Sequence, residues 1–257
     1  MGRSEQMAES YSKHFDGTDR AARYEGGEYA AGSYADLLWR IEQDQLRAVI
    51  AGLRIVKPRI EALDFASGTG RITALLENHV DAVTGIEISE SMCELARKKL
   101  TRANILCRNI LAPDAEVEGK YDLITAFRFF LNAEPELRLP VLSALKTRLR
   151  DRDSLLVFNN HGNLWSHKLL LWPYHRIRRF GKGRSTTGNY LSHAEIIPLL
   201  QSAGLQLISV MGCGFYSAKV AGMLGGPRAE QWERRAAEPG WRNGWCVNQM
   251  YVVKLAG

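Results

Sequence analysis

The residues of this sequence that could do chemistry lie where apolar runs end. An apolar run over residues 60–65 contains Asp64 and is followed by Ala-Ser-Gly-Thr-Gly, and the next apolar positions, 72, 75 and 76, recur at helical spacing. Glycines let a backbone approach a ligand closely, and a helix start offers free N–H groups and a positive dipole end. The pattern predicts a strand, a turn and a helix that cradle a nucleotide-like ligand.

The glycine spacing narrows the choice of ligand. A dinucleotide-binding loop carries G-x-G-x-x-G, whereas Thr73 stands where the third glycine would be. The segment resembles the first motif of class I S-adenosylmethionine (SAM) dependent methyltransferases, with Asp64, Gly68 and Gly70 in place and Ala66 replacing the first glycine. The resemblance implies SAM as cofactor, with Ser67 and Arg71 of the same turn also in contact. A glycine-rich turn without a ligand stays open as the alternative.

A second acidic residue follows the next predicted strand. The segment 81–87 ends in Glu87, and an acid at this place can accept hydrogen bonds from both ribose hydroxyls of a dinucleotide or of SAM. Ser89 is predicted to cap a helix that contains Met92, and Ile88 and Met92 join the predicted cofactor contacts. The alternative for Glu87 is an ordinary acid in a solvent-facing loop.

Three further positions complete the predicted cofactor site. In the methyltransferase family the third strand ends in an Asp that binds the adenine amino group, beside an apolar residue. Asn109 and Ile110 stand there, and an Asn can still accept through its carbonyl. Phe127, at the end of the fourth predicted strand, and Tyr34, from an N-terminal segment expected to fold over the cofactor, are the remaining candidates.

The residues after the fourth strand favour a small-molecule acceptor. Amino methyltransferases of DNA and RNA carry Asp or Asn, two prolines and an aromatic residue there, but this chain has Arg-Phe-Phe-Leu at 128–131. It has no Pro-Cys for cytosine carbon methylation, and we find no paired glutamates of the arginine methyltransferase kind. A sugar, an acid or a natural product is the expected acceptor, methylated on N or O by in-line displacement.

A base is needed for only part of this chemistry. A nitrogen acceptor needs a neutral lone pair, whereas a hydroxyl must lose a proton. The candidate base is His161, which lies with Asn159, Asn160 and Asn163 at the end of the fifth predicted strand. This polar cluster is equally typical of a turn, where asparagine and glycine are favoured for their backbone conformation. The next candidates are His167, His193 and Tyr190.

These residues need a particular fold to bring them together. Successive strand–helix units predict a Rossmann-like, doubly wound, seven-stranded mixed α/β sheet, in which ligands sit beyond the carboxyl ends of the strands. The resemblance implies that the last strand is antiparallel and inserts between the fifth and sixth. We expect a helical cap over 1–58 and a SAM-binding domain over 59–257, with a basic, aromatic, lid-like segment at 161–190. The connection at 225–245 has no predicted role.

The net charge of +6 is local. Between His161 and Tyr190 there is no Asp or Glu, and six cations lie there: Lys168, Arg176, Arg178, Arg179, Lys182 and Arg184. This segment could cover an acidic or phosphorylated acceptor, contact an anionic membrane surface through 164–184, or be a solvated loop. Because the charge is local, nucleic acid is not the expected partner.

Two functions of other classes stay open. The basic stretch 168–184 would suit an RNA-binding or RNA-modifying protein. The glycine turn would also suit a SAM-binding partner subunit without catalysis, which turnover of SAM to S-adenosylhomocysteine (SAH) would exclude. The sequence leaves the oligomeric state open.

Composition indicates a folded protein with a large core. Of its 257 residues, 46% are hydrophobic, and no apolar run reaches the length of a membrane span. The N-terminus lacks a charged-then-apolar signal, so we expect a cytoplasmic protein. The four cysteines have no metal-ligand spacing, so we expect them to be reduced and mostly buried and expect no metal.

Overall fold

The computed structural model describes residues 30–112, 119–171 and 191–257. The strands are β1 (Glu61–Phe65), β2 (Ala82–Glu87), β3 (Asn104–Cys107), β4 (Leu123–Ala126), β5 (Leu155–Asn160), β6 (Leu205–Cys213) and β7 (Asn248–Leu255). The α-helices are α3 (Tyr34–Val56), α4 (Arg71–Glu77), α5 (Glu90–Lys99), α6 (Pro135–Lys146), α8 (His193–Ser202), α9 (Ala218–Leu224) and α10 (Gly226–Ala237), and the short 3₁₀ helices are η1 (His167–Leu171) and η2 (Trp241–Trp245).

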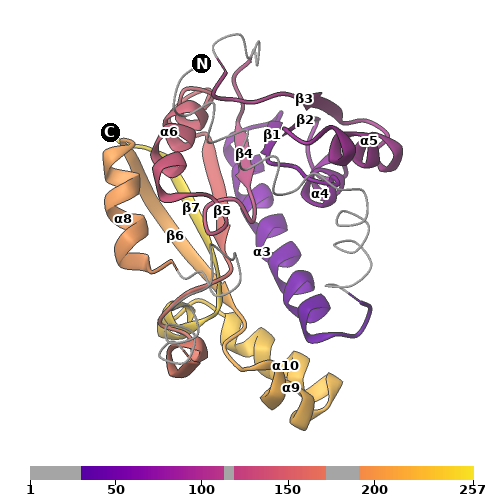
Figure 1. Ribbon diagram of the computed structural model, residues 1–257, viewed down its shortest axis with the longest axis vertical. Helices are drawn as coiled ribbons and strands as arrows, with labels where there is room; N and C mark the ends of the chain where they lie inside the picture. The colour runs from indigo at the N-terminus through magenta and orange to yellow at the C-terminus, as the bar shows by residue number, and fades with distance from the viewer. Residues whose placement is uncertain (1–29, 113–118, 172–190) are drawn as a thin grey trace, which may run out of the picture.

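The strands form one seven-stranded sheet in the order β3-β2-β1-β4-β5-β7-β6 (Figure 1). The pairs from β3 to β5 are parallel, and β7 runs antiparallel to both of its neighbours. The predicted fold class and the insertion of the last strand between the fifth and sixth are therefore confirmed. The order reverses at β1 and β4, where ligands of open α/β sheets bind.

Each face of the sheet is covered by helices because side chains of a strand alternate between the two faces. On one face, α6 and α8 pack on the sheet through residues that include Leu142, Leu145 and Leu200. On the other face, α3 and α4 contribute residues such as Leu46, Ile50 and Leu76. The core is thus split into two layers, one on each side of the strands.

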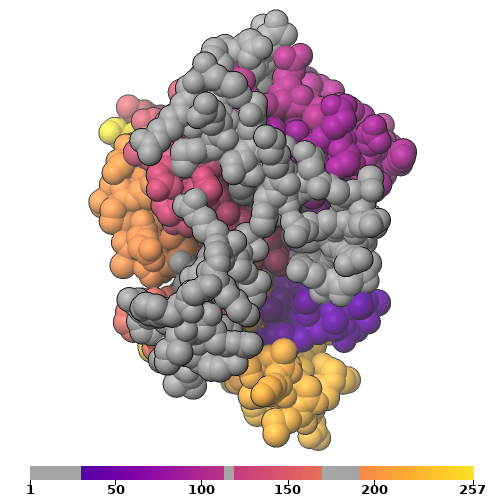
Figure 2. Space-filling model, viewed as in Figure 1, coloured from indigo at the N-terminus to yellow at the C-terminus, as the bar shows by residue number. Residues whose placement is uncertain are grey.

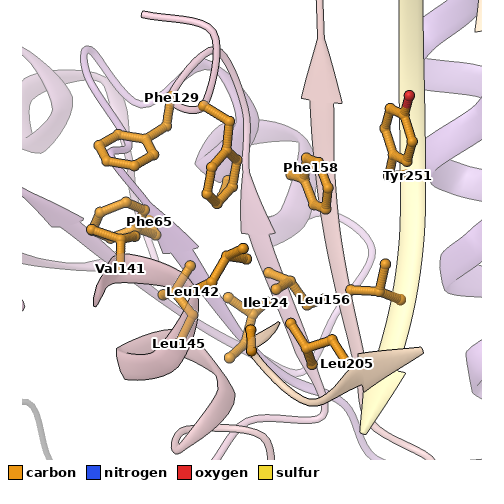
Figure 3. Packing of buried hydrophobic residues seen from close by; sticks show 14 of the residues in the cluster. Phe65, Ile124, Phe129, Val141, Leu142, Leu145, Leu156, Phe158, Leu205 and Tyr251 are labelled. Atoms are coloured by element: carbon orange, nitrogen blue, oxygen red, sulfur yellow. The ribbon is translucent and has the colours of Figure 1, made fainter. Parts of the chain in front are cut away.

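A row of aromatic rings crosses the first layer (Figure 3). It runs from Phe65 through Phe129, Phe130 and Phe158 to Tyr251, with neighbouring ring centroids 4.8–5.2 Å apart. Phe158 and Tyr251 are stacked with an interplanar angle of 4°, and the other pairs meet edge to face. These rings pack β1, β4, β5 and β7 against one another near the carboxyl ends of the parallel strands.

The helix predicted before the first strand is present as α3. Its N-cap Ser33 accepts from the backbone N–H of Asp36, and its apolar stripe includes Leu46, which is fully buried. Through this stripe α3 packs on the sheet as part of the same core. The aromatic segment expected to fold over the cofactor lies outside the described residues up to residue 29.

The connection at 225–245, for which the sequence predicted no role, is helical. Together with α9, the helix α10 follows the carboxyl end of β6 and lies against the N-terminal part of α3 (Figures 1 and 2). Glu233 of α10 is fully buried and accepts hydrogen bonds from the backbone N–H groups of Gly214, Phe215 and Tyr216. One carboxylate thus anchors the turn after β6 to α10.

Of the lid-like segment, only 161–171 is described, and it contains η1. The basic residues at 176–184 lie outside the described residues. The four cysteines are free and three of them are buried, which confirms that prediction. In the part of the chain that the structure describes, no helix combines the length and apolar character needed to cross a bilayer.

Candidate functional site

The turn between β1 and α4 has the backbone that its small residues permit. Ala66, Gly68 and Gly70 all have positive φ, at 54°, 56° and 81°. A Cβ on Gly68 would meet only the Met92 sulfur, at 3.9 Å, whereas a Cβ on Gly70 would lie 2.9 Å from a methyl carbon of Leu100. Gly68 therefore keeps space open in front of the turn, and Gly70 lets α5 pack behind it.

The carboxylate of Glu87 binds this turn directly. Its Oε2 accepts from the backbone N–H of Gly68 at 2.8 Å, and its Oε1 accepts from the N–H groups of Ile88 and Ser89 at 2.8 and 3.0 Å. Only 7% of Glu87 is exposed. A carboxylate offers about four acceptor sites, and the two donors at Oε1 use both sites of that oxygen, so a ligand hydroxyl would donate to Oε2.

Asp64 lies beneath the turn rather than at its surface. It is 1% exposed, and it accepts hydrogen bonds from the hydroxyls of Thr73 at 2.6 Å and Thr125 at 2.7 Å. Burial raises the pKa of Asp64 to about 6, and the negative charge of Glu87 acts in the same direction, while the two hydroxyls oppose the rise. This carboxyl therefore titrates near neutral pH.

An open cavity of about 840 Å³, including the solvent at its mouth, lies in front of the turn. Its wall joins the glycine turn, the ends of β2 and β4, and the first turns of α4 and α5. The hydroxyl oxygen of Ser67 in this wall is buried and has no hydrogen-bond partner among the described residues. The lining residues are Asp64, Ala66, Ser67, Gly68, Thr69, Arg71, Ile72, Glu87, Ile88, Met92, Phe127, Arg128 and Asn132.

A second cavity of about 450 Å³ continues on the other side of Glu87. It shares Ala66, Glu87 and Ile88 with the first, and Asn109 and Ile110 form part of its wall. The amide oxygen of Asn109 accepts from the N–H of Leu111 at 3.0 Å, and Ile110 is buried. The two cavities together give an elongated site with an acidic residue at its middle and a more apolar end.

Arg128 enters the first cavity from a strained backbone. It follows β4 with a φ of 61°, a region that non-glycine residues rarely adopt. Its N–H donates to the side-chain oxygen of Asn159 at 2.6 Å, and the amide nitrogen of Asn159 donates to Glu42 at 3.1 Å. Asn159 and Glu42 are both buried, so a hydrogen-bonded chain from α3 through β5 sets the place of Arg128.

Comparison with known proteins identifies the segment that forms these cavities. Residues 62–152 match the family model of a methyltransferase domain. This segment is therefore similar to a methyltransferase domain. The match begins in β1 and ends before β5, so it contains the glycine turn, Glu87, Asn109 and Arg128.

Two curated relatives resemble part of this chain in sequence. A malonyl-[acyl-carrier protein] O-methyltransferase of Acetivibrio thermocellus is 30% identical over 128 residues, which cover 48% of this chain and 43% of that protein. The enzyme of the same name from Priestia megaterium is 32% identical over 111 residues, covering 40% and 38%. The matched part spans less than half the length of each relative.

Solved structures show the same fold over nearly the whole chain. The magnesium protoporphyrin IX methyltransferase of Synechocystis PCC 6803, with bound SAH, superposes with a TM-score of 0.63 and 16% identity, covering 96% of this chain and 99% of that one. The plantazolicin methyltransferase BamL, in complex with a triazolic desmethylPZN analogue and SAH, superposes with a TM-score of 0.60 and 16% identity, covering 99% of this chain and 97% of that one. The class I methyltransferase fold therefore extends beyond the segment that the family model matches.

Most of the predicted cofactor residues lie together in the segment that the family model matches. Nine line the first cavity and two more line only the second: Asp64, Ala66, Ser67, Gly68, Arg71, Glu87, Ile88, Met92 and Phe127, with Asn109 and Ile110. Gly70 lines neither cavity because it faces α5. Tyr34 also lines neither: its hydroxyl lies 2.5 Å from a carboxylate oxygen of Glu233, because the start of α3 packs against α10.

His161 follows β5 near the cationic part of the site but does not line either cavity. Burial lowers its pKa well below the usual value, and the nearby charges of Arg128, Lys168 and Arg71 lower it further. Its Nδ1 is buried without a hydrogen-bond partner in the described part of the chain. The lowered pKa disfavours the protonated imidazole, so His161 is a weaker base than a free histidine.

The other candidate bases have different surroundings. His193 Nδ1 lies 3.2 Å from the hydroxyl of Tyr251 at the edge of the aromatic row. Burial and Lys168 lower the pKa of His167. Tyr190 lies outside the described residues.

The asparagines near His161 hold the chain in place. Asn160 donates to the carbonyl of Leu191 and accepts from Gly162, and Asn163 donates to the carbonyls of Gly244 and Cys246. Together with Asn159, they join the end of β5 to α3 and to the loops before α8 and β7. These contacts favour the interpretation of the polar cluster as a structural turn.

Sequence reasoning missed four residues that line the first cavity: Thr69, Ile72, Arg128 and Asn132. The segment 128–131 was used only to exclude nucleic-acid chemistry, although its position after β4 was a signal for the site. Asn132 donates to the carbonyl of Arg128 at 2.7 Å. It also missed Trp39 of α3, whose ring lies 4.4 Å from the guanidinium of Arg71.

Proposed function

We propose that this protein is a SAM-dependent methyltransferase that transfers a methyl group to N or O of a small-molecule acceptor. The observation that carries the proposal is the pair of cavities joined at Glu87. One is bounded by the glycine turn and the other by Asn109 and Ile110. Their lining fits a nucleoside linked to an amino acid, because it combines the Glu87 carboxylate with a more apolar region at Ile110.

Each part of the cofactor has a matching group in this chain. Glu87 accepts from a ribose hydroxyl, Asn109 and Ile110 hold the adenine, and the open space at Gly68 admits the amino-acid part. Arg71, steadied by Trp39, takes the cofactor carboxylate. The buried Ser67 hydroxyl supplies one more polar group to this wall.

The protein's part in such a reaction is orientation. The sulfonium of SAM supplies an activated methyl group with a good leaving group, so the cavity has to hold an acceptor atom in line with it. Phe127, Arg128 and Asn132, which follow β4, form the wall on which the acceptor would lie. The malonyl and protoporphyrin methyltransferases to which the chain is similar also act on acceptors other than nucleic acid, by their names.

Calorimetry with SAM tests the cofactor assignment. Gly68→Arg fills the space in front of the turn and abolishes SAM binding. Gly52→Arg is the matched control, because Gly52 lies on the exposed side of α3 where a Cβ meets nothing within 4 Å, and it leaves the affinity unchanged. Circular dichroism checks that both variants fold. Equal affinity of folded Gly68→Arg and wild-type protein would refute the proposal.

The alternatives rest on weaker support. The RNA-binding hypothesis depends on 168–184, of which only 168–171 belongs to the described residues. Formation of SAH with any acceptor excludes a partner subunit without catalysis. A cytoplasmic location and contact with a membrane surface stay predictions.

A further inference from the structure

The first cavity is lined by two acidic residues, Asp64 and Glu87, and by two cationic ones, Arg71 and Arg128. Asp64 of β1 accepts from the hydroxyls of Thr73 and Thr125, and Glu87 of β2 accepts from the backbone N–H of Gly68. Arg128 follows β4, which borders β1 on the side away from β2. The carboxylates suit the cationic part of SAM, and Arg128 belongs to the wall on which the acceptor would lie.

Lys168 lines neither cavity but lies near Arg128. It lies in η1, which follows β5, and β5 pairs in parallel with β4, so the chain brings it to the same edge as Arg128. Its ammonium donates to the carbonyl of His161 at 3.4 Å. Burial and the positive charge of Arg128 both lower the pKa of Lys168. The two cations therefore lie close to each other.

The same cations make His161 unsuited to deprotonating an acceptor. A positive environment opposes the gain of a proton by the imidazole, so a hydroxyl acceptor would find a weak base here. An acceptor that arrives as an anion needs no base at all. It would also be attracted by Arg128 and Lys168.

We propose that the acceptor group is a carboxylate, bound by Arg128 and Lys168, and that the product is a methyl ester. This inference rests on the proposed function. A carboxylate oxygen forms a bond to the methyl carbon while the carbon–sulfur bond breaks and its electron pair stays on sulfur. The negative acceptor and the positive sulfonium become a neutral ester and a neutral thioether, and no proton is transferred.

A carboxylate fits this site better than other oxygen acceptors. Its pKa is about 4, so it is ionised at pH 7 without help, whereas a phenol or an alcohol is not. The guanidinium of Arg128 matches the planar fork of a carboxylate. Asn159 holds the backbone of Arg128 in an unfavourable conformation. Residues with such strained backbones are often found at functional sites.

The first test uses SAM with a tritiated methyl group and a fixed panel of acceptors. The carboxylates are malonate, glutarate, octanoate and benzoate, and the matched controls are octanol, octylamine, phenol and phenyl phosphate. Alkali hydrolyses methyl esters and releases volatile labelled methanol, but it leaves N-methyl and ether products intact. We expect alkali-labile label with at least one carboxylate and none with the controls.

Two outcomes of this test overturn the inference while the proposed function stands. One is an alkali-stable product with an alcohol, an amine, the phenol or the phosphate. The other is no transfer to any carboxylate by protein that binds SAM in calorimetry. Loss of SAM binding itself would instead refute the proposed function.

The second test separates recognition from folding. Lys168→Gln raises KM for the preferred carboxylate about tenfold and leaves the dissociation constant of SAM unchanged. Lys219→Gln, the same change at an exposed lysine of α9, alters neither quantity. Arg128→Gly keeps the backbone conformation, since glycine accepts a φ of 61°, and also raises KM for the carboxylate. Unchanged KM in both Lys168→Gln and Arg128→Gly overturns the assignment of these two residues.

Discussion

The side chain of Glu87 holds the backbone of Gly68. This bond of 2.8 Å joins the end of β2 to the turn after β1, across two neighbouring parallel strands. A residue predicted to bind a ribose therefore also shapes the turn that receives the rest of the cofactor. Loss of its charge affects both roles together.

We expect Glu87→Gln to weaken SAM binding by about tenfold or more, because hydrogen bonds to an ionised acceptor are each worth roughly 1.5–3 kcal/mol. A glutamine keeps one oxygen, but its amide group would face one of the backbone N–H donors. Calorimetry measures the affinity. Glu90→Gln, at an exposed position in the first turn of α5, is the control and should bind SAM as the wild type does. Equal binding by both variants would contradict the role of Glu87.

Ala66 offers a test of backbone strain. Its φ of 54° lies in the left-handed region, where a Cβ costs about 1 kcal/mol. We expect Ala66→Gly to raise the free energy of unfolding, by up to about 1 kcal/mol, measured in urea. Ala62→Gly, in the buried middle of β1, should lower it instead. Destabilisation by Ala66→Gly similar to that by Ala62→Gly would show that the turn is not strained.

Asp64 should make stability depend on pH. Its pKa is about 6 in the folded protein against 3.8 as the reference value, so the folded state holds the proton more tightly than the unfolded state. The stabilisation from this group is complete below about pH 4 and is lost as pH rises through about 6, and it amounts to about 3 kcal/mol. Urea unfolding at several pH values measures it.

The variant Asp64→Asn removes this titration, so its free energy of unfolding should change less between about pH 4 and pH 6 than that of the wild type. Bound SAM adds positive charge near Asp64 and should lower its pKa, so SAM affinity rises with pH over the same range in the wild type only. An Asp64→Asn protein with the pH dependence of the wild type would place the titrating group elsewhere.

The hydrogen-bonded chain from Glu42 to Arg128 can be tested with a matched pair. Asn159 and Asn248 both donate to the same carboxylate oxygen of Glu42, at 3.1 and 3.2 Å, but only Asn159 also holds the N–H of Arg128. Replacing either by Leu removes one donor from Glu42 and should cost about 2 kcal/mol of stability. Only Asn159→Leu should also reduce methyl transfer, measured as kcat/KM, by about tenfold. Equal losses of activity in both would mean that Arg128 does not depend on Asn159.

Local patterns in the sequence were sufficient for the framework of the site. The order of strands and helices follows from hydrophobic period, and the turn after β1 follows from its small residues. The end of β2 at Glu87 was predicted to the residue. Element ends were less certain: β3 ends at Cys107, so Asn109 and Ile110, predicted within the strand, lie in the loop that follows it. The end of a strand depends on its hydrogen bonds to neighbouring strands, and the sequence of one segment does not show these bonds.

What only the tertiary structure decided concerns residues that are alike in sequence but differ in their neighbours. Gly68 and Gly70 belong to one motif, yet one faces the cavity and the other faces α5. Tyr34 was predicted at the cofactor because it is aromatic and N-terminal, but it meets Glu233 from a segment 199 positions away. Arg128 becomes a site residue because Asn159 of β5 holds its backbone. Period and turn chemistry act over a few residues and can be read along the chain, whereas these contacts join segments that meet only after the sheet has formed.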